Sequence, residues 1–177
     1  MLILITGGVR SGKSRRAAEL AGQNRAGQNR AGRGRVWFVA TAGRTDREMR
    51  ARIAAHRRER PAKWRTVEAG SRVVEAVAKI PPGSTVLLDC VTLWVGRMLV
   101  DRVPEPEMLR RARELAKLAA RRRLKLIAVT NEVGSGIIPP TRLGRAFQDA
   151  LGGVNRELAS RAGRVELMVS GLPLRVK

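Results

Sequence analysis

The chain has 177 residues, of which 44% are apolar, so it is long enough for one compact domain with its own core. Its single cysteine, Cys90, excludes a disulfide framework and favours a reducing compartment, so we expect a cytoplasmic protein. The net charge of +21 is compatible with nucleic-acid binding, but two Phe, three Trp and no Tyr offer few surfaces on which bases could stack. We therefore expect no nucleic-acid partner.

Six apolar segments predict strands, at residues 2–6, 36–40, 65–68, 86–89, 124–130 and 166–170. Most are continuous apolar runs, which are typical of strands buried on both faces of a parallel sheet. Helical patterns alternate with them, at residues 13–22, 46–59, 71–79, 105–122 and 141–162. This alternation predicts an α/β fold, a single domain over residues 1–177 with a mostly parallel sheet flanked by helices. The apolar run at residues 2–5 is too short for a signal peptide or a membrane span, so we expect no membrane insertion.

Residues 21–30 read AGQNRAGQNR, a five-residue unit that occurs twice. Two copies are too few for a solenoid, and Gly, Asn and Gln at this density favour a surface loop. We expect a flexible insertion at about residues 22–34 without a function of its own. A tail that binds nucleic acid or another partner is the alternative.

Residues 7–14 read GGVRSGKS, which matches the phosphate-binding pattern G-x-x-x-x-G-K-[ST] in full. An apolar strand precedes the pattern and a helical stretch follows it, so backbone N–H groups and the helix N-terminus would face the phosphates. Lys13 would reach the β- and γ-phosphates, and the Ser14 hydroxyl would ligate magnesium. The pattern predicts a site for a nucleoside triphosphate with Mg²⁺.

Acidic and amide residues follow two of the predicted strands. The run at 86–89 ends in Asp89, and an acid at this place in phosphate-loop enzymes holds magnesium directly or through water. Asn131 and Glu132 follow the run at 124–130. Because ligands bind at the carboxyl ends of strands in open α/β sheets, these two residues would line the site or structure its loop.

His56 is the only histidine, and arginines surround it in the stretch RIAAHRRERP. A lone histidine near an apolar helix face is usually structural. The neighbouring cations, however, favour the neutral imidazole, which is the nucleophilic form. An imidazole can attack phosphorus and form a phosphoramidate. The residues alone leave both interpretations open.

Taken together, these segments resemble the bifunctional adenosylcobinamide kinase / adenosylcobinamide-phosphate guanylyltransferase family of cobalamin biosynthesis. The resemblance runs nearly from end to end, through ITGGVRSGKS, DREMRARIAAHRRERPAKWRTVE, LLDCVTLWV, VTNEVGSGIIP and RLGRAFQDALGGVNRELA to VELMVSGLPLRVK. The phosphate loop alone is generic, whereas the spaced combination of RIxxHRxxRPxxWRTxE with TNEVGxGIxP is specific.

The resemblance implies two reactions and a fold related to RecA-like phosphate-loop proteins. A kinase step moves the γ-phosphate of ATP or GTP to the hydroxyl of adenosylcobinamide. A guanylyltransferase step then joins GMP from GTP to the new phosphate through a guanylylated histidine, and His56 stands at the matching position. The resemblance also implies Mg²⁺ as cofactor and a homotrimer.

The resemblance implies a set of site residues as well. His56 and Lys13 would be catalytic, and Ser14 and Asp89 would bind Mg²⁺. Members of the family often carry Glu at the position of Asp89, so the carboxylate here is one methylene shorter. Nucleotide contacts would come from Gly7, Gly8, Val9, Arg10, Ser11, Gly12, Lys13, Ser14, Ala40, Thr41, Ala42, Arg57, Arg58, Glu59, Arg60, Glu68 and Asp89.

Two other functions fit the residues. A different phosphate-loop kinase or nucleotidyltransferase, acting on another small metabolite, would form no covalent GMP adduct. A nucleic-acid-dependent ATPase would use the positive charge, and its binding would depend steeply on salt. Within the family itself, a member that acts mainly as guanylyltransferase is a third alternative.

Overall fold

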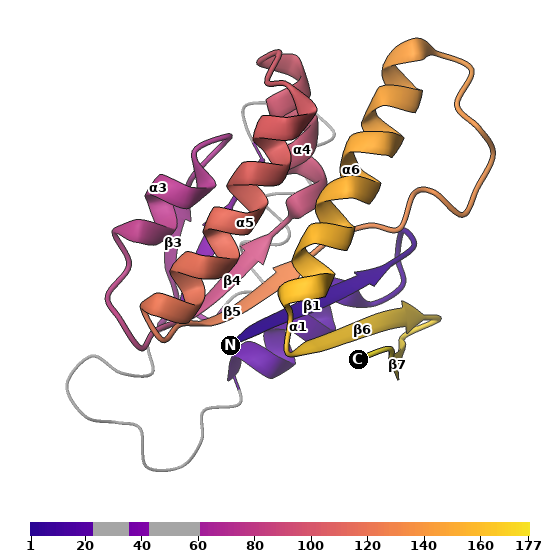
Figure 1. Ribbon diagram of the computed structural model, residues 1–177. Helices are drawn as coiled ribbons and strands as arrows, with labels where there is room; N and C mark the ends of the chain where they lie inside the picture. Colours follow the sequence, from indigo (N-terminus) through magenta and orange to yellow (C-terminus); the bar gives the residue numbers. More distant parts are fainter. Residues whose placement is uncertain (23–35, 43–60) are drawn as a thin grey trace.

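The computed structural model describes residues 1–22, 36–42 and 61–177. Their strands form one seven-stranded sheet in the order β3-β2-β4-β5-β1-β6-β7, with helices on both faces (Figure 1). The first six strands pair in parallel, and β7 pairs antiparallel with β6. The predicted α/β fold with a mostly parallel sheet is therefore confirmed. The elements are β1 (Leu2–Gly7), α1 (Lys13–Gly22), β2 (Val36–Ala40), β3 (Arg65–Glu68), α3 (Val73–Ala78), β4 (Thr85–Asp89), α4 (Val91–Val100), α5 (Glu105–Arg121), β5 (Lys125–Val129), α6 (Arg142–Arg161), β6 (Arg164–Val169) and β7 (Leu172–Arg175).

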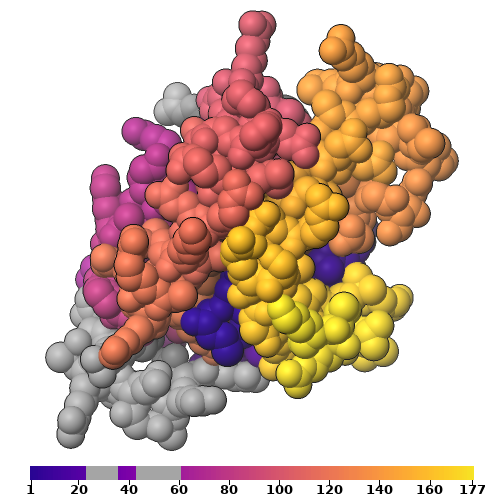
Figure 2. Space-filling view, viewed as in Figure 1, coloured from indigo at the N-terminus to yellow at the C-terminus, as the bar shows by residue number. Residues whose placement is uncertain are grey.

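The central strands β1, β4 and β5 are buried on both faces of the sheet, which explains their continuous apolar runs. In β1, Leu2 and Leu4 belong to the larger core cluster, which also contains the buried residues of α3, α4, α5 and α6. Ile3 and Ile5 point the other way, into the smaller cluster with α1. Helices α5 and α6 contact each other on the face of the sheet that carries the larger core cluster, as the space-filling view also shows (Figure 2).

Parallel pairing brings the carboxyl ends of the central strands to one edge of the sheet. β1 lies between β5 and β6, and β5 in turn pairs with β4, so that Asp89 is in register with Val129. The loop after β1, Asp89 at the end of β4 and the segment after β5 are therefore neighbours at this edge. This is the edge at which open α/β sheets bind ligands.

Two elements were not predicted. Helix α4 buries Val91, Trp94, Val95 and Met98, and its run VTLWV is apolar on several sides, so it has no clear helical period. β7 contains Pro173, a residue that argues against a central strand but is tolerated on an edge strand. Several predicted strand ends also differ by one or two residues, since runs of apolar residues do not mark where pairing stops.

Parts of the sequence prediction fall on segments that the structure does not describe. The predicted helix at 46–59, which includes His56, lies outside the described residues, as do positions 23–34 of the predicted insertion. Gly22, where that insertion was predicted to begin, is the last residue of α1. No helix in the described ranges is long and apolar enough to cross a membrane.

A buried ion pair joins α1 to β6. The Glu166 side chain is 1% exposed, and its carboxylate accepts hydrogen bonds from Arg16 Nε at 3.0 Å and Arg16 Nη2 at 3.1 Å. Arg164 pairs with the same carboxylate. The hydrogen bonds from Arg16 lower the pKa of Glu166 from its ordinary value of 4.5. The pair fixes the helix that begins with Lys13 against the strand beside β1.

We expect Glu166→Gln to lower the free energy of unfolding by about 2–3 kcal/mol, because Arg16 loses its buried charged partner and keeps only its pair with the exposed Glu19. The wild-type pKa is lowered on folding, so its contribution is complete above the ordinary pKa of 4.5 and is lost as the pH falls through the folded value. Urea denaturation at pH 7 and pH 4 measures the free energy of unfolding.

Glu107→Gln, at a surface pair, is the control and should lower the free energy of unfolding much less. Equal losses of stability in the two variants would contradict the role of Glu166.

Candidate active site

The end of β1 and the loop that follows it pass so close to the end of β6 and the β6–β7 turn that two positions require glycine. Gly7 has φ of 147°, and a Cβ there would lie 2.6 Å from the carbonyl oxygen of Met168. Gly12 has φ of 92°, and a Cβ there would lie 3.2 Å from the Cα of Gly171. The Gly171 N–H donates to the carbonyl of Ser11 at 3.0 Å. These contacts hold the loop in the curled shape that phosphate binding needs.

Lys13 curls back over this loop from the first position of α1. Its side chain is buried, and Nζ donates to the Gly8 carbonyl at 2.5 Å. Burial lowers the pKa of Lys13, and the neighbouring Cys90 and Asp89 oppose this effect. Because an ammonium has three donors, Lys13 can keep its bond to Gly8 and still donate to phosphate oxygens.

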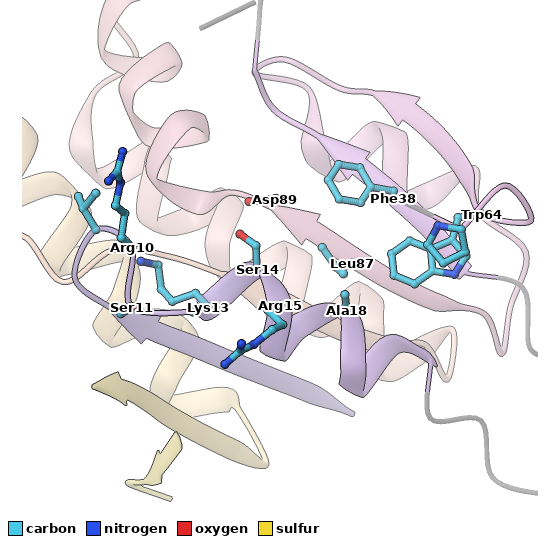
Figure 3. Close-up of a pocket in the computed structure, with 13 residues that line it drawn as sticks. Arg10, Ser11, Lys13, Ser14, Arg15, Ala18, Phe38, Trp64, Leu87 and Asp89 are labelled. Atoms are coloured by element: carbon cyan, nitrogen blue, oxygen red, sulfur yellow. The ribbon is translucent and has the colours of Figure 1, made fainter. Parts of the chain in front are cut away.

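A cavity of about 830 Å³ opens beside the loop. In Figure 3 the Ser14 hydroxyl points from α1 toward Asp89 at the end of β4. The cavity is lined by Val9, Arg10, Ser11, Gly12, Lys13, Ser14, Arg15, Ala18, Phe38, Pro61, Trp64, Leu87 and Asp89. Six of the eight residues of the predicted phosphate loop therefore line the same cavity as Asp89.

The end of the cavity away from the phosphate loop is apolar. Phe38, Trp64 and Leu87 line it, and Ala18 faces them from α1 (Figure 3). Trp64 Nε1 is buried and has no hydrogen-bond partner among the described residues. One polar end and one flat apolar end suit a triphosphate joined to a heterocyclic base. Sequence analysis did not single out these apolar residues, although Trp64 lies within the RPxxWRTxE motif.

The Ser14 hydroxyl and the Asp89 carboxylate suit magnesium. This ion usually takes one or two carboxylates from the protein and completes its shell with water and substrate phosphates. Within the described residues, no group of three or more His, Cys, Asp or Glu side chains forms a denser metal-binding cluster. One hydroxyl and one carboxylate beside a phosphate loop are the donor set that phosphate-loop enzymes use.

Other predicted contacts lie at the same edge but outside the cavity lining. The Thr41 side chain is 1% exposed and joins β2 to β4, since its Oγ1 bonds to the Cys90 carbonyl and N–H, each at 2.8 Å. Ala40 and Ala42 flank it, and Glu68 is exposed at the end of β3. Gly7 and Gly8 shape the loop without lining the cavity. His56, Arg57, Arg58, Glu59 and Arg60 lie outside the described residues.

A buried polar network fixes the segment after β5. Thr130 Oγ1 donates to Asn155 Oδ1 at 2.7 Å, and Asn155 Nδ2 donates to the Asn131 carbonyl at 3.0 Å. The Asn131 N–H donates to Thr92 Oγ1 at 2.8 Å. Asn131 therefore ties β5 to α4 and α6, which is the loop-structuring role, and Glu132 follows it. Thr92 and Asn155 were not predicted, because their partners are 39 and 24 residues away in sequence.

Cys90 follows Asp89 and should be a slow nucleophile. Burial, and next the charge of Asp89, raise the pKa of its thiol from 9.0 to about 11. The thiolate fraction at pH 8 is then lower by about a hundredfold, and alkylation should slow in proportion. Labelling with iodoacetamide measures this, because the chain has one cysteine. The urea-unfolded protein is the control; rapid labelling of the folded protein at pH 8 would contradict the prediction.

Comparison with known proteins extends these observations to the whole chain. The family model described as "Cobinamide kinase / cobinamide phosphate guanyltransferase" matches residues 3–176. The chain is 40% identical to the bifunctional adenosylcobalamin biosynthesis protein CobU of Escherichia coli K12 and 38% identical to CobU of Salmonella typhimurium LT2, with both chains covered in full. It is 37% identical to the bifunctional adenosylcobalamin biosynthesis protein CobP of Pseudomonas aeruginosa PAO1, over 98% of this chain and 96% of that protein. The predicted resemblance is confirmed, and the chain belongs to the cobinamide kinase / cobinamide phosphate guanyltransferase family.

Proposed function

We propose that this protein phosphorylates adenosylcobinamide with ATP or GTP and then transfers GMP from GTP to adenosylcobinamide phosphate, giving adenosyl-GDP-cobinamide. One observation carries the proposal. In a chain that matches this family over residues 3–176, the phosphate loop and Asp89 line one cavity with a polar and an apolar end. Such a cavity accepts the nucleotide that both steps consume.

In the kinase step, Lys13 donates to the oxygens of the transferring γ-phosphoryl group, where negative charge spreads in the transition state. The loop N–H groups hold the neighbouring phosphates. Ser14 and Asp89 would hold Mg²⁺, which when bound neutralises further charge on the phosphates. Burial of Lys13 strengthens its interaction with an anion, because less water competes for it.

In the guanylyl step, the neutral imidazole of His56 attacks the α-phosphorus of GTP. An N–P bond forms, the bond from the α-phosphorus to the bridging oxygen breaks, and pyrophosphate leaves with the bonding electrons. A phosphate oxygen of adenosylcobinamide phosphate then displaces the imidazole. This assignment rests on the family pattern and on the absence of a second histidine in the sequence. Arg57, Arg58 and Arg60 would stabilise the phosphates. From the same family pattern we propose that Glu59 and Glu68 also contact the nucleotide.

We extend the proposal to a cytoplasmic homotrimer. The β6–β7 edge gives the assembly a physical basis, because Val169, Leu172, Leu174 and Val176 are all more than half exposed there. Exposed apolar residues gathered at one place favour a protein interface. Sedimentation of the intact protein tests the assembly.

Two labelling reactions test the function. With α-labelled GTP, the protein should acquire an acid-labile label that leaves when adenosylcobinamide phosphate is added. With γ-labelled ATP or GTP, the label should pass to adenosylcobinamide. Phosphorylation without any covalent adduct would instead favour another phosphate-loop kinase. An adduct without kinase turnover would identify a guanylyltransferase alone.

A further inference from the structure

Glu132 is held against the beginning of the phosphate loop by two hydrogen bonds. Its N–H donates to the Gly7 carbonyl at 3.2 Å, and its Oε2 accepts from Thr6 Oγ1 at 3.1 Å. The residue is exposed, and no donor in the described part of the chain is bonded to Oε1. The carboxylate therefore has a fixed position and one oxygen available to a ligand.

The anchor of Glu132 lies beside the anchor of Lys13. Lys13 Nζ bonds to the Gly8 carbonyl, and the Glu132 N–H bonds to the carbonyl of the preceding residue, Gly7. Because the lysine of a phosphate loop reaches the β- and γ-phosphates, Glu132 is placed near the γ-phosphate end of a bound triphosphate.

Glu132 also lies toward the opposite face of the sheet from the nucleotide cavity. Phe38 and Leu87, which line the cavity, belong to the core cluster on the α1 face. Side chains alternate along a strand, so Thr6 points to the same face as Leu4, whose cluster contains the residues of α3 to α6. The Thr6–Glu132 bond is therefore on the far side of the phosphate loop from the apolar end of the cavity.

In-line transfer needs the acceptor on that far side, since the acceptor oxygen approaches γ-phosphorus opposite to the leaving oxygen. We propose that Glu132 is a catalytic residue of the kinase step, and that its Oε1 accepts the proton of the acceptor hydroxyl. This inference rests on the proposed kinase function. The hydroxyl oxygen bonds to γ-phosphorus, the bond from γ-phosphorus to the bridging oxygen breaks, and the nucleoside diphosphate leaves with the electrons. The proton moves to Glu132 and from there to water, because the side chain is exposed.

The other described groups at this edge are less suited to take the proton. Asp89 is the proposed magnesium ligand, and Glu68 lies at the end of the edge strand β3, with β2 and β4 between it and β5. Cys90, the residue after Asp89, carries a thiol instead of a carboxylate. The guanylyl step gives Glu132 no proton to accept, since a neutral imidazole and a phosphate oxygen are the nucleophiles there. A base at Glu132 thus serves one of the two steps.

Glu132→Gln separates this role from support of the loop, because the amide oxygen still accepts from Thr6. We expect kcat for phosphorylation of adenosylcobinamide to fall about a hundredfold, as for loss of a general base, while the rate of GMP adduct formation and the melting temperature stay the same. Glu75→Gln makes the same chemical change at an exposed position of α3 and should alter neither step.

Formate distinguishes a base from a positioning group. It fits the space left in Glu132→Ala and should raise the kinase rate of that variant, whereas Glu132→Gln, which leaves no such space, should not respond. An unchanged kinase rate in Glu132→Gln, an equal loss in both steps, or no rescue of Glu132→Ala would overturn the assignment. A wild-type protein that forms the adduct but phosphorylates nothing would refute the proposed kinase function and this role together, whereas full turnover in Glu132→Gln refutes the role of Glu132 alone.

Discussion

Lys13→Ala is expected to slow both transfers, by about 10²–10³-fold in kcat, because it removes the buried ammonium that we propose to face the β- and γ-phosphates. In the kinase step these phosphates carry the charge of the transferring group and the leaving group. In the guanylyl step they are the pyrophosphate that leaves. One side chain therefore supports departure from two different phosphorus atoms, and γ-label transfer and α-label adduct formation measure the two losses separately.

A second variant at position 13 shows whether lost activity comes from lost stability. Burial lowers the pKa of Lys13, which means that its charged form is disfavoured in the folded protein without an anion. Lys13→Met, which keeps the apolar stem, should therefore melt at the wild-type temperature or above it while losing both activities. Lys63→Ala removes an exposed lysine and should change neither. Normal rates in Lys13→Met would contradict the role of Lys13 in both steps.

The sequence predicted those parts of the site whose chemistry depends on residues at a fixed, short spacing. The phosphate loop needs glycine at positions 7 and 12, and it needs Lys13 and Ser14 at fixed spacing, so the motif alone locates one end of the cavity. The central strands were recognisable because they are buried on both faces of the sheet. The order of the strands was not, since pairing between distant segments such as β1 and β5 leaves no local pattern.

The rest of the site depends on contacts between distant segments. Phe38 and Leu87 belong to buried strands, and nothing in their spacing separates a residue that lines a cavity from one that fills the core. The bond from Thr6 to Glu132 joins residues 126 positions apart. Sequence analysis placed Glu132 at a strand end, but only the structure shows that its carboxylate is anchored to the strand that leads into the phosphate loop.

His56→Ala is expected to abolish the GMP adduct and to leave phosphorylation of adenosylcobinamide within about twofold of the wild-type rate, because only the guanylyl step is proposed to pass through a covalent intermediate. The measurement is the α-labelled band after a fixed time with GTP, together with γ-label transfer in the same preparation. The melting temperature of the variant checks that it is folded.

The two variants together decide which residue carries the nucleotide. Lysine and histidine both form acid-labile phosphoramidates, so acid lability alone does not exclude Lys13 as the nucleophile. If Lys13 carried GMP, His56→Ala would retain a full-strength adduct, and this result would contradict the assignment. If His56 carries it, His56→Ala loses the adduct and keeps the kinase, whereas Lys13→Ala slows both steps. Only a nucleophile at His56 gives that combination, because the phosphate loop is proposed to serve both steps and the imidazole only one.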